Sequence, residues 1–485
     1  MKVLNSSAFQ SRKSLPIKVM QFGGGNFLRA FVDISIQKIN SATNFNAGVA
    51  VVKPTERGDY KALKSQDGLF SVNLEGYAND KFVQELTLVD CVQKVVNPYT
   101  EWDAYLSLAE LPDLRFIISN TTEAGIVFNT DDTFDSNPPK EFPAKLTVWL
   151  FHRFKHFKGD ADKGCMFLPV ELIEKNGEAL KDCILQYAQQ WHLGKAFKYW
   201  IVHSCTFYNT LVDRIVSGYP KDKIEQIEAK LDYTDQLAIT GELYHSWLIE
   251  GPEDILAEFP FHKTDLNIEL VTDLDSYRNL KVRILNGAHT SMVPVAYLLG
   301  ERLVKDAMDN VNVVEFIKNV LMNEVLITLD FPQDYKQQFA NDVLTRFKNP
   351  ALEHKLISIS LNSTSKFVTR LLPTLKDYLE ITGSLPVNIT FALSALVRFY
   401  EGNFNNEKID LNDKSSILEY FSNTWQQFRE NNIDLNTLTS QILGNTDIWN
   451  EDLNQISGLT SNITNNLSNI EQYGFEEAVR LVNQK

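Results

Sequence analysis

A lysine, an asparagine and a histidine lie close together in the sequence, at Lys281, Asn286 and His289. These residue types suit the reduction of a ketone, because a lysine can donate a proton to the developing alkoxide while asparagine and histidine stabilise its negative charge. At about 100° of rotation per α-helical residue, Asn286 falls about 140° and His289 about 80° from Lys281. One helix would therefore hold all three at the edge of a cleft. The alternative is a solvated lysine, a helix-capping asparagine and a histidine with satisfied hydrogen bonds.

The other histidines and the cysteines give little support for a metal centre. Of the eight histidines, only His152 and His156 have a metal-like HxxxH spacing. We expect them on an exposed, basic helix face with no nearby carboxylate to complete a zinc site, and we predict no metal cofactor. The four cysteines are scattered and form no CxxC, so we expect them to be reduced and buried.

A glycine-rich turn near the N-terminus is the second feature that could do chemistry. A short, mostly apolar run from Ile17 to Phe22 ends in three glycines at 23–25, and Phe27 to Ile39 then has helical spacing. The backbone N–H groups of such a strand–turn–helix junction suit a pyrophosphate. The third glycine of the usual dinucleotide fingerprint would fall at Leu28, so the pattern alone is equally that of a structural turn.

The residue after the second predicted strand bears on the type of cofactor. A fold that binds NAD usually carries an acidic residue there, which binds the ribose. Here residues 49–52 are followed by Lys53, which would equally meet a 2′-phosphate, and the first acidic residue is Glu56. On these residues alone, NAD and NADP remain alternatives.

The elements that must position these residues change in character along the chain. Up to about residue 270, apolar strand-like runs alternate with helical segments, and residues 70–74 and 82–96 look like an inserted antiparallel pair. Beyond it, helical spacing dominates and continues through the Asn-rich tail. We therefore predict an α/β, Rossmann-type dinucleotide-binding domain with a parallel sheet over residues 1–275, and an all-α substrate and catalytic domain over residues 276–485.

Charge and hydropathy narrow the class of protein. The net charge of −15 argues against a nucleic-acid partner, although a pocket for a small anion sets its own local field. No apolar run approaches the roughly 18 residues of a membrane span, and the first residues lack the apolar core of a signal peptide. We expect a cytoplasmic protein without a membrane partner, and the sequence leaves its oligomeric state open.

Several segments follow the same order as in a known group of enzymes. They are GGGNFLRAF at 23–31, QDGLF at 66–70, TTEAG at 121–125, LVDRI at 211–215 and the K-x4-N-x2-H cluster. Together they resemble the mannitol dehydrogenase family of polyol-specific long-chain dehydrogenases. The resemblance implies a Rossmann-type N-terminal domain, a helical C-terminal domain, and metal-independent hydride transfer between a nicotinamide cofactor and a sugar-derived substrate.

The resemblance also implies roles for individual residues. Lys281 would be the acid/base, and Asn286 and His289 would hold the reacting oxygen. Asp213 would orient the substrate or support the lysine, with a structural carboxylate as the alternative. The cofactor would be NAD, held by Val19, Met20, Gln21, Phe22, Gly23, Gly24, Gly25, Asn26, Phe27, Leu28, Arg29, Ala30, Thr122 and Glu123.

One departure from the family pattern bears on the substrate. Members that act on mannitol and fructuronate carry a Ser-Cys-Asp-Asn run whose last Asn helps to bind the reacting oxygen. The segment here is Pro169 to Leu172, and Leu172 cannot donate a side-chain hydrogen bond. Either Asn286 and His289 carry more of that load, or Glu171 and Lys175 rearrange the site.

This departure favours a branch of the family that interconverts a keto-hexuronate and an aldonate in hexuronate catabolism. The substrate carboxylate needs a cationic partner. The candidates are Arg346, Lys366, Arg370 and Arg214, each with an ion pair as its alternative role. A relative specific for another hexuronate, a polyol or a polyol phosphate is the first alternative function, and a non-catalytic NAD-binding scaffold is the second.

Overall fold

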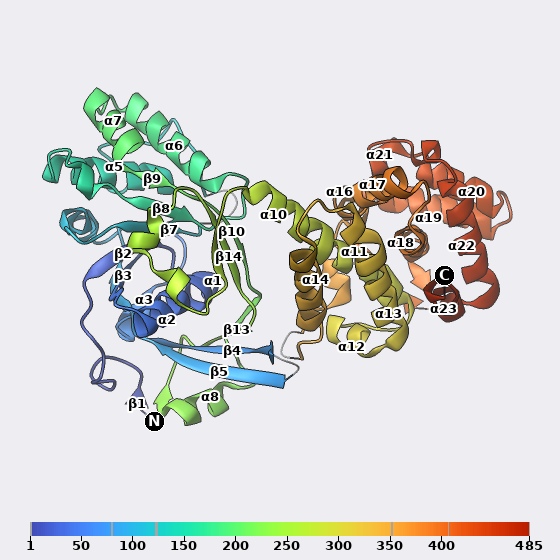
Figure 1. Cartoon of the computed structure of the whole chain (residues 1–485), viewed down its shortest axis with the longest axis horizontal. Helices are drawn as coiled ribbons and strands as arrows, with labels where there is room; N and C mark the ends of the chain where they lie inside the picture. Colours follow the sequence, from blue (N-terminus) through green and yellow to red (C-terminus); the bar gives the residue numbers. More distant parts are fainter. Residues whose placement is uncertain (1, 79–80, 122–124, 351–352, 406, 485) are drawn as a thin grey trace. The chain divides into compact units, whose positions relative to one another are not determined.

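The chain divides into two compact units, Met1–Leu274 and Asp275–Lys485 (Figure 1). The computed structural model describes residues 2–78, 81–121, 125–350, 353–405 and 407–484. Each unit has its own hydrophobic core. Among the described residues, no helix is both long and apolar enough to cross a membrane.

The first unit contains a six-stranded parallel sheet with the strand order β6-β3-β2-β7-β8-β9. The chain begins this sheet in the middle at β2, builds outward to β6, and then returns to the other side of β2 for β7. This is the strand order of a Rossmann dinucleotide-binding fold, in which ligands bind where the order reverses. The strands are β2 (Ile17–Phe22), β3 (Gly48–Val52), β6 (Val92–Val96), β7 (Phe116–Ser119), β8 (Met166–Pro169) and β9 (Thr206–Phe207).

Helices cover both faces of this sheet, as predicted for strands that are apolar on both sides. Val19 and Val51 pack into one buried cluster, and Met20 and Val52 pack into the cluster on the opposite face. The helices of the unit are α1 (Asn26–Leu28), the π-helical η1 (Arg29–Asp33), α2 (Ile34–Ala42), α3 (Lys61–Ser65), α4 (Trp102–Leu106), η2 (Ser107–Glu110), α5 (Phe142–His156), η3 (Ala161–Lys163), α6 (Asn176–Gln190), α7 (Lys195–Ser204), α8 (Ile224–Leu231), α9 (Ile255–Glu258) and η4 (Phe261–Lys263).

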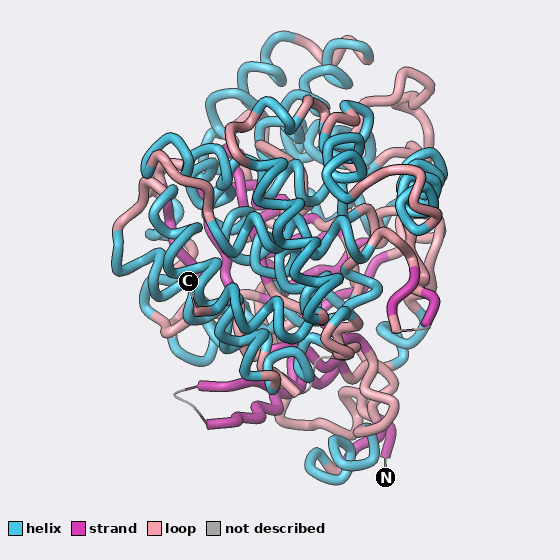
Figure 2. The backbone as a smooth tube through the Cα atoms, turned by 90° about the vertical axis from the view of Figure 1, so that its right-hand side faces the viewer, coloured by secondary structure: helices cyan, strands magenta, loops and turns pink. Residues whose placement is uncertain are grey.

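The predicted antiparallel insertion is only partly right. β4 (Phe70–Ala78) and β5 (Lys81–Val89) pair antiparallel and lie side by side in both views (Figures 1 and 2). Residues 92–96, expected to continue the second strand, form β6 in the parallel sheet instead. The chain changes sheet at Asp90 and Cys91, whose backbone N–H groups both donate to Oε1 of Gln37, at 3.1 and 3.0 Å. That side chain satisfies the two donors that leave one ladder before the next begins.

Two smaller sheets complete the first unit. One has the order β11-β13-β4-β5, and the other has the order β10-β14-β15. The N-terminal strand β1 forms a short parallel pair with β12, which follows α8. The additional strands are β1 (Lys2–Val3), β10 (Asn209–Asp213), β11 (Val216–Gly218), β12 (Tyr233–Thr234), β13 (Ile239–Glu242), β14 (Ser246–Glu250) and β15 (Ile268–Val271).

Helices, cyan in Figure 2, form nearly all of the regular secondary structure of the second unit, which confirms the all-α prediction and the helical tail. Trp425 and Trp449 are almost fully buried in its core. Its elements are α10 (Leu274–Lys281), the π-helical η5 (Val282–Asn286), α11 (Gly287–Leu298), α12 (Val304–Asp309), α13 (Val311–Asn319), η6 (Val320–Val325), η7 (Leu326–Thr328), α14 (Gln333–Phe347), α15 (Leu356–Ile359), α16 (Ser363–Arg370), α17 (Leu372–Thr382), α18 (Val387–Phe399), β16 (Asn403–Phe404), β17 (Glu407–Lys408), α19 (Ser415–Arg429), α20 (Leu435–Leu443), α21 (Thr446–Trp449), η8 (Leu453–Gln455), α22 (Leu459–Tyr473) and α23 (Phe475–Asn483).

Cysteine and histidine side chains are the residue types that most often bind zinc. All four cysteines are free and buried, as expected. His152 and His156 lie on an exposed part of α5, and one carboxylate does approach them. Glu110, more than forty residues earlier in the chain, approaches His152 Nε2 at 3.0 Å and His156 Nδ1 at 3.9 Å. Within the described ranges, no group of three or more His, Cys, Asp or Glu residues could hold a metal ion.

Candidate functional site

The glycine turn follows β2 directly, at the point where the strand order of the parallel sheet reverses. Gly25 and Asn26 are exposed, Gly24 and Phe27 are half-buried, and the other residues predicted to hold the cofactor in this segment are buried. Direct contact with a ligand is therefore open to residues 24–27, and the buried neighbours support the turn. The predicted partners Thr122 and Glu123 lie outside the described residues.

Gly23 and Gly25 serve different purposes in this turn. Gly23 has a φ of +123°, and a Cβ added there would lie 2.6 Å from Leu28 Cδ1. Leu28, at the position of the third fingerprint glycine, therefore packs against Gly23. Gly25 has a φ of −71°, and a Cβ added there would meet nothing within 4 Å. Gly23 is needed by the fold itself, whereas the absence of a side chain at Gly25 leaves open space at the start of the helix.

Two polar side chains fix the shape of the turn. Tyr60, in the loop after β3, accepts a hydrogen bond from the Gly24 N–H at 2.8 Å. Arg29 donates to the Gly24 carbonyl at 3.1 Å and to Leu237 O at 2.6 Å, and burial lowers the pKa of its guanidinium to about 10. Gly25 begins the helix without a side-chain cap among the described residues, so the first-turn N–H groups keep their capacity to bind an anion.

A buried acid, Asp33, follows the glycine turn and was not predicted from the sequence. Asp33, on η1, is fully buried, and its Oδ2 accepts from Gln21 Nε2 at 3.3 Å. Burial raises the pKa of Asp33 to about 7, against the opposing effects of the Gln21 hydrogen bond and the Arg29 charge. Nothing in the sequence pattern marked this residue, because an aspartate on a helix is usually exposed.

We expect Asp33→Asn to stabilise the protein at alkaline pH. A carboxyl whose folded-state pKa lies above its unfolded value of 3.8 contributes stability that is full below about pH 4 and lost as pH rises through about 7. The free energy of unfolding of the wild type should therefore fall, relative to the variant, by about 2–3 kcal/mol between pH 5 and pH 8. Thermal melts across this range measure the difference, with Asp103→Asn on the exposed face of α4 as the control. Parallel curves for wild type and Asp33→Asn would contradict the shift.

The charged residues that follow β3 and β8, Lys53 and Glu171, also make hydrogen bonds within the protein. Lys53 Nζ donates to the Glu56 carbonyl at 2.8 Å and lies 5.8 Å from the centre of the Tyr99 ring. Glu171 is buried and accepts hydrogen bonds from Ser119 Oγ, Thr121 N and Thr121 Oγ1, at 2.9–3.0 Å. Burial raises the pKa of Glu171. Leu172 beside it is 59% exposed, so its side chain makes little contact with the protein.

Asp213 ends β10 and Arg214 follows it, and the two side chains have different surroundings. Asp213 is half-buried and pairs in register with Ser246 of β14. Arg214 is buried, and its three nitrogens donate to the carbonyls of Tyr244, Ala30 and Leu243. Because these donors are occupied by the backbone, Arg214 has a structural role rather than that of a carboxylate receptor.

Lys281, Asn286 and His289 lie on one continuous helix, formed by α10, η5 and α11. The residues between Lys281 and Gly287 are π-helical. A π turn is closed by i→i+5 hydrogen bonds and holds about one residue more than an α turn. With that residue removed from the α-helical count, Asn286 falls about 40° and His289 about 20° from Lys281. The angles expected for a regular helix were too wide, and the three side chains share one face.

The end of α16 packs closely against this helix at Gly287. A Cβ added to Gly287 would lie 3.4 Å from Leu371 Cδ2, so the end of α16 approaches the helix directly here. Asn286 is half-buried, and its side-chain amide makes no hydrogen bond to any described residue, whereas its carbonyl accepts from Thr290 Oγ1 at 2.8 Å. The His289 ring stacks on Phe347. The amide of Asn286 is thus available to a ligand.

Two cations, Lys366 and Arg370, lie on the neighbouring helix α16. Arg370 donates to Thr290 Oγ1 at 3.3 Å, and Lys366, one turn earlier, donates to the Ile359 carbonyl at 2.7 Å. Among the described residues, neither has a carboxylate within ion-pair distance. Burial lowers the pKa of both, and for Lys366 the Arg370 charge adds to this effect. Arg346, another of the four predicted cations, is buried near the end of α14.

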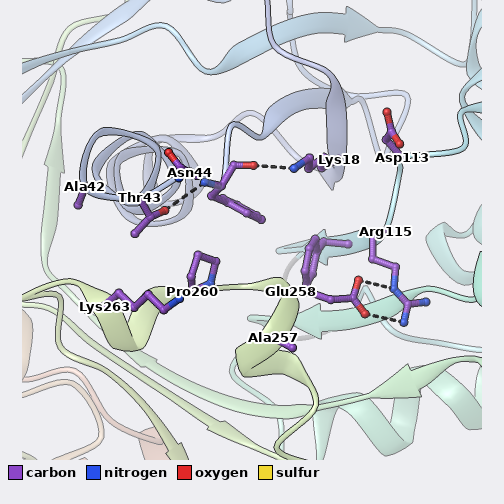
Figure 3. A pocket seen from close by; sticks show the side chains of 12 residues that line it. Lys18, Ala42, Thr43, Asn44, Asp113, Arg115, Ala257, Glu258, Pro260 and Lys263 are labelled. Carbon is purple, nitrogen blue, oxygen red and sulfur yellow. Dashed lines mark hydrogen bonds and ion pairs between the residues drawn. The ribbon is translucent and has the colours of Figure 1, made fainter.

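A cavity of about 570 Å³ lies at the amino ends of the parallel strands, near the first residues of β2 and β7 and away from the glycine turn (Figure 3). None of the predicted site residues lines it. Arg115 and Glu258 point toward each other there, with two hydrogen bonds of 2.7 and 2.9 Å, and Lys18 donates to the Phe45 carbonyl. Since ligands of such sheets bind at the carboxyl ends of the strands, we do not assign the candidate site to this cavity.

Comparison with known proteins identifies a Rossmann domain followed by a C-terminal domain, as the sequence predicts. The profile of the mannitol dehydrogenase Rossmann domain matches residues 17–263, and that of the mannitol dehydrogenase C-terminal domain matches residues 273–471. The chain is 43% identical to the altronate oxidoreductase of Yersinia enterocolitica over 480 residues, which covers 99% of both proteins. It is also 43% identical to the altronate oxidoreductase of Bacillus subtilis over 479 residues, covering 99% of this chain and 98% of that protein.

Two solved structures share the fold. D-sorbitol dehydrogenase in substrate-free form has a TM-score of 0.79 and 19% identity, covering 99% of this chain and 100% of that one. Pseudomonas fluorescens mannitol 2-dehydrogenase, in a ternary complex with NAD and D-mannitol, has a TM-score of 0.64 and 17% identity, covering 100% of both chains. At these identities the likeness concerns the fold alone.

Proposed function

Because the chain belongs to the mannitol dehydrogenase family, we propose that it is an NAD-dependent oxidoreductase that interconverts D-tagaturonate and D-altronate. Full-length relatives named altronate oxidoreductases support this substrate pair. The observation that carries the proposal is that Lys281, Asn286 and His289 lie on one helix, and that Arg370, a cation without a carboxylate partner in the described part of the chain, donates to Thr290 of the same helix. Such a set of side chains suits a substrate with both a ketone and a carboxylate.

In this proposal the second unit performs the proton transfer. Lys281 donates a proton from Nζ to the carbonyl oxygen as reduction proceeds, and accepts it in the reverse direction. The Asn286 amide and the His289 imidazole donate hydrogen bonds to the same oxygen and stabilise its developing negative charge. For Asp213, in the first unit, we propose a role in orienting the substrate.

The first unit fits a dinucleotide, which supplies the hydride when bound. The open space at Gly25 and the uncapped N–H groups that follow it suit a pyrophosphate at the switch point of the sheet. We propose NAD rather than NADP because the Lys53 ammonium donates to the Glu56 carbonyl and is largely buried, so it is not presented to a 2′-phosphate. Thr122 and Glu123 remain the proposed neighbours of the ribose and nicotinamide.

The test of this function is NADH oxidation by the purified protein with D-tagaturonate, D-fructuronate and D-fructose. We expect the highest kcat/KM with tagaturonate and the lowest with fructose, which lacks the carboxylate. A higher value with fructuronate would assign the chain to a related hexuronate reductase. NADH binding without turnover of any of the three would identify a non-catalytic scaffold.

Replacing Arg370 tests how the carboxylate is recognised. A charge-assisted hydrogen bond contributes about 1.5–3 kcal/mol, so Arg370→Ala should raise the KM for tagaturonate by roughly 10–150-fold. The KM for NADH should change little. Lys376→Ala, which removes a surface lysine paired with Glu451, is the matched control. An equal loss of kcat/KM for tagaturonate and fructose would contradict a role in binding the carboxylate.

A further inference from the structure

Two aromatic side chains from separate segments contact the ring of His289. The Phe347 ring is stacked against it, with centroids 4.2 Å apart and planes at 22°. The His354 ring meets it edge to face, at 5.3 Å and 81°. We propose that Phe347 and His354 are positioning residues that fix the plane of the His289 imidazole. This inference rests on the proposed function, in which His289 donates a hydrogen bond to the reacting oxygen.

Both positioning residues are themselves held firmly by the fold. Phe347 is the last residue of α14 and is only 5% exposed. His354 is anchored through its backbone, because its carbonyl accepts from Val304 N at 2.9 Å, and the next residue, Lys355, forms an antiparallel bridge with Leu303. The His289 ring therefore lies against two groups whose positions are set by elements other than its own helix.

The contacts matter because a hydrogen bond from an imidazole is directional. Rotation of the ring about χ2 moves its N–H away from the acceptor, and the interaction weakens steeply at poor angles. A stacked face and a perpendicular edge together oppose that rotation. Burial also lowers the pKa of His354, which favours a neutral ring beside His289. His354 makes no hydrogen bond through its side chain to any described residue, so the ring contact is its identifiable role in the structure.

A double-mutant cycle tests whether these residues act through His289. Phe347→Leu and His354→Ala each remove a ring contact, whereas His354→Phe keeps an aromatic edge. We expect Phe347→Leu and His354→Ala to lower kcat for tagaturonate reduction by about 5–10-fold with little change in the KM for NADH, and His354→Phe to retain kcat within about twofold. In a His289→Asn background, neither Phe347→Leu nor His354→Ala should lower kcat further.

An equal fold-loss in both backgrounds would overturn the inference, because it would show that the residues act independently of His289. So would a His354→Phe enzyme as slow as His354→Ala. Wild-type protein without turnover would contradict the proposed function instead. In that case, NMR of histidine-labelled protein decides the inference, since the His289 ring signals should shift in Phe347→Leu and His354→Ala but stay near their wild-type positions in His354→Phe. Unshifted His289 signals in Phe347→Leu would refute the contact.

Discussion

Replacing Lys281 by alanine is expected to lower kcat for tagaturonate reduction by about 10³-fold, within the range known for the loss of a general acid. Without the ammonium, the proton for the developing alkoxide must come from water, while Asn286 and His289 still stabilise its charge. The variant should keep its affinity for NADH, because the glycine turn that we propose to bind it belongs to the first unit. Both kcat and kcat/KM should therefore fall together, as for an interaction made mainly in the transition state.

Steady-state kinetics with tagaturonate and NADH, together with NADH titration of the variant, measure these quantities. Lys318→Ala, which removes an exposed lysine on α13, is the control for the loss of a positive charge from the same unit. Partial recovery of kcat with added small primary amines would show that the missing group is the proton donor. Turnover of Lys281→Ala within about tenfold of the wild type would refute the mechanism.

Replacing Gly25 by valine is expected to weaken NADH binding by about 100-fold, equivalent to about 2.7 kcal/mol, while leaving thermal stability unchanged. The backbone at Gly25, with φ −71° and ψ 170°, is open to any residue, and a Cβ there meets no protein atom within 4 Å. The added side chain would therefore occupy only the space into which we propose that the pyrophosphate fits. Gly25→Ala, with a single methyl group, should have a smaller effect of the same kind.

The matched control is Gly23→Ala in the same turn. Gly23 has a positive φ, and its added Cβ would collide with Leu28, so this variant should lower Tm as well as NADH affinity. Fluorescence titration with NADH and thermal melts separate the two effects. Normal NADH affinity in a stable Gly25→Val protein would place the cofactor elsewhere.

Several features of the fold could be predicted because they depend only on short stretches of the sequence. Apolar runs such as residues 49–52 indicate strands buried on both faces, and their alternation with helical spacing indicates the α/β class. The glycines after β2 mark the first strand–helix junction. The K-x4-N-x2-H pattern places three polar side chains within a few turns of one helix, whatever packs around it.

Other features depend on pairing and packing between distant residues, which periodicity does not encode. Residues 92–96 read as a strand in any register, but only the position of β3 makes them part of the parallel sheet. Glu110 approaches the His152–His156 pair although its place in the sequence gave no sign of it. From the sequence, Arg214 is a candidate anion receptor, but in the structure its donors are occupied by backbone carbonyls.

The same distinction applies to the proposed active site. The residue types of the trio, their order and their place on one helix can be predicted locally, because covalent spacing and helical rise are local properties. Two other features come from the packing of separate helices: Arg370 approaches Thr290 from α16, and Phe347 and His354 flank His289. Both depend on how separate helices pack, and packing is settled by the complementary shapes of whole elements rather than by the pattern of any one segment.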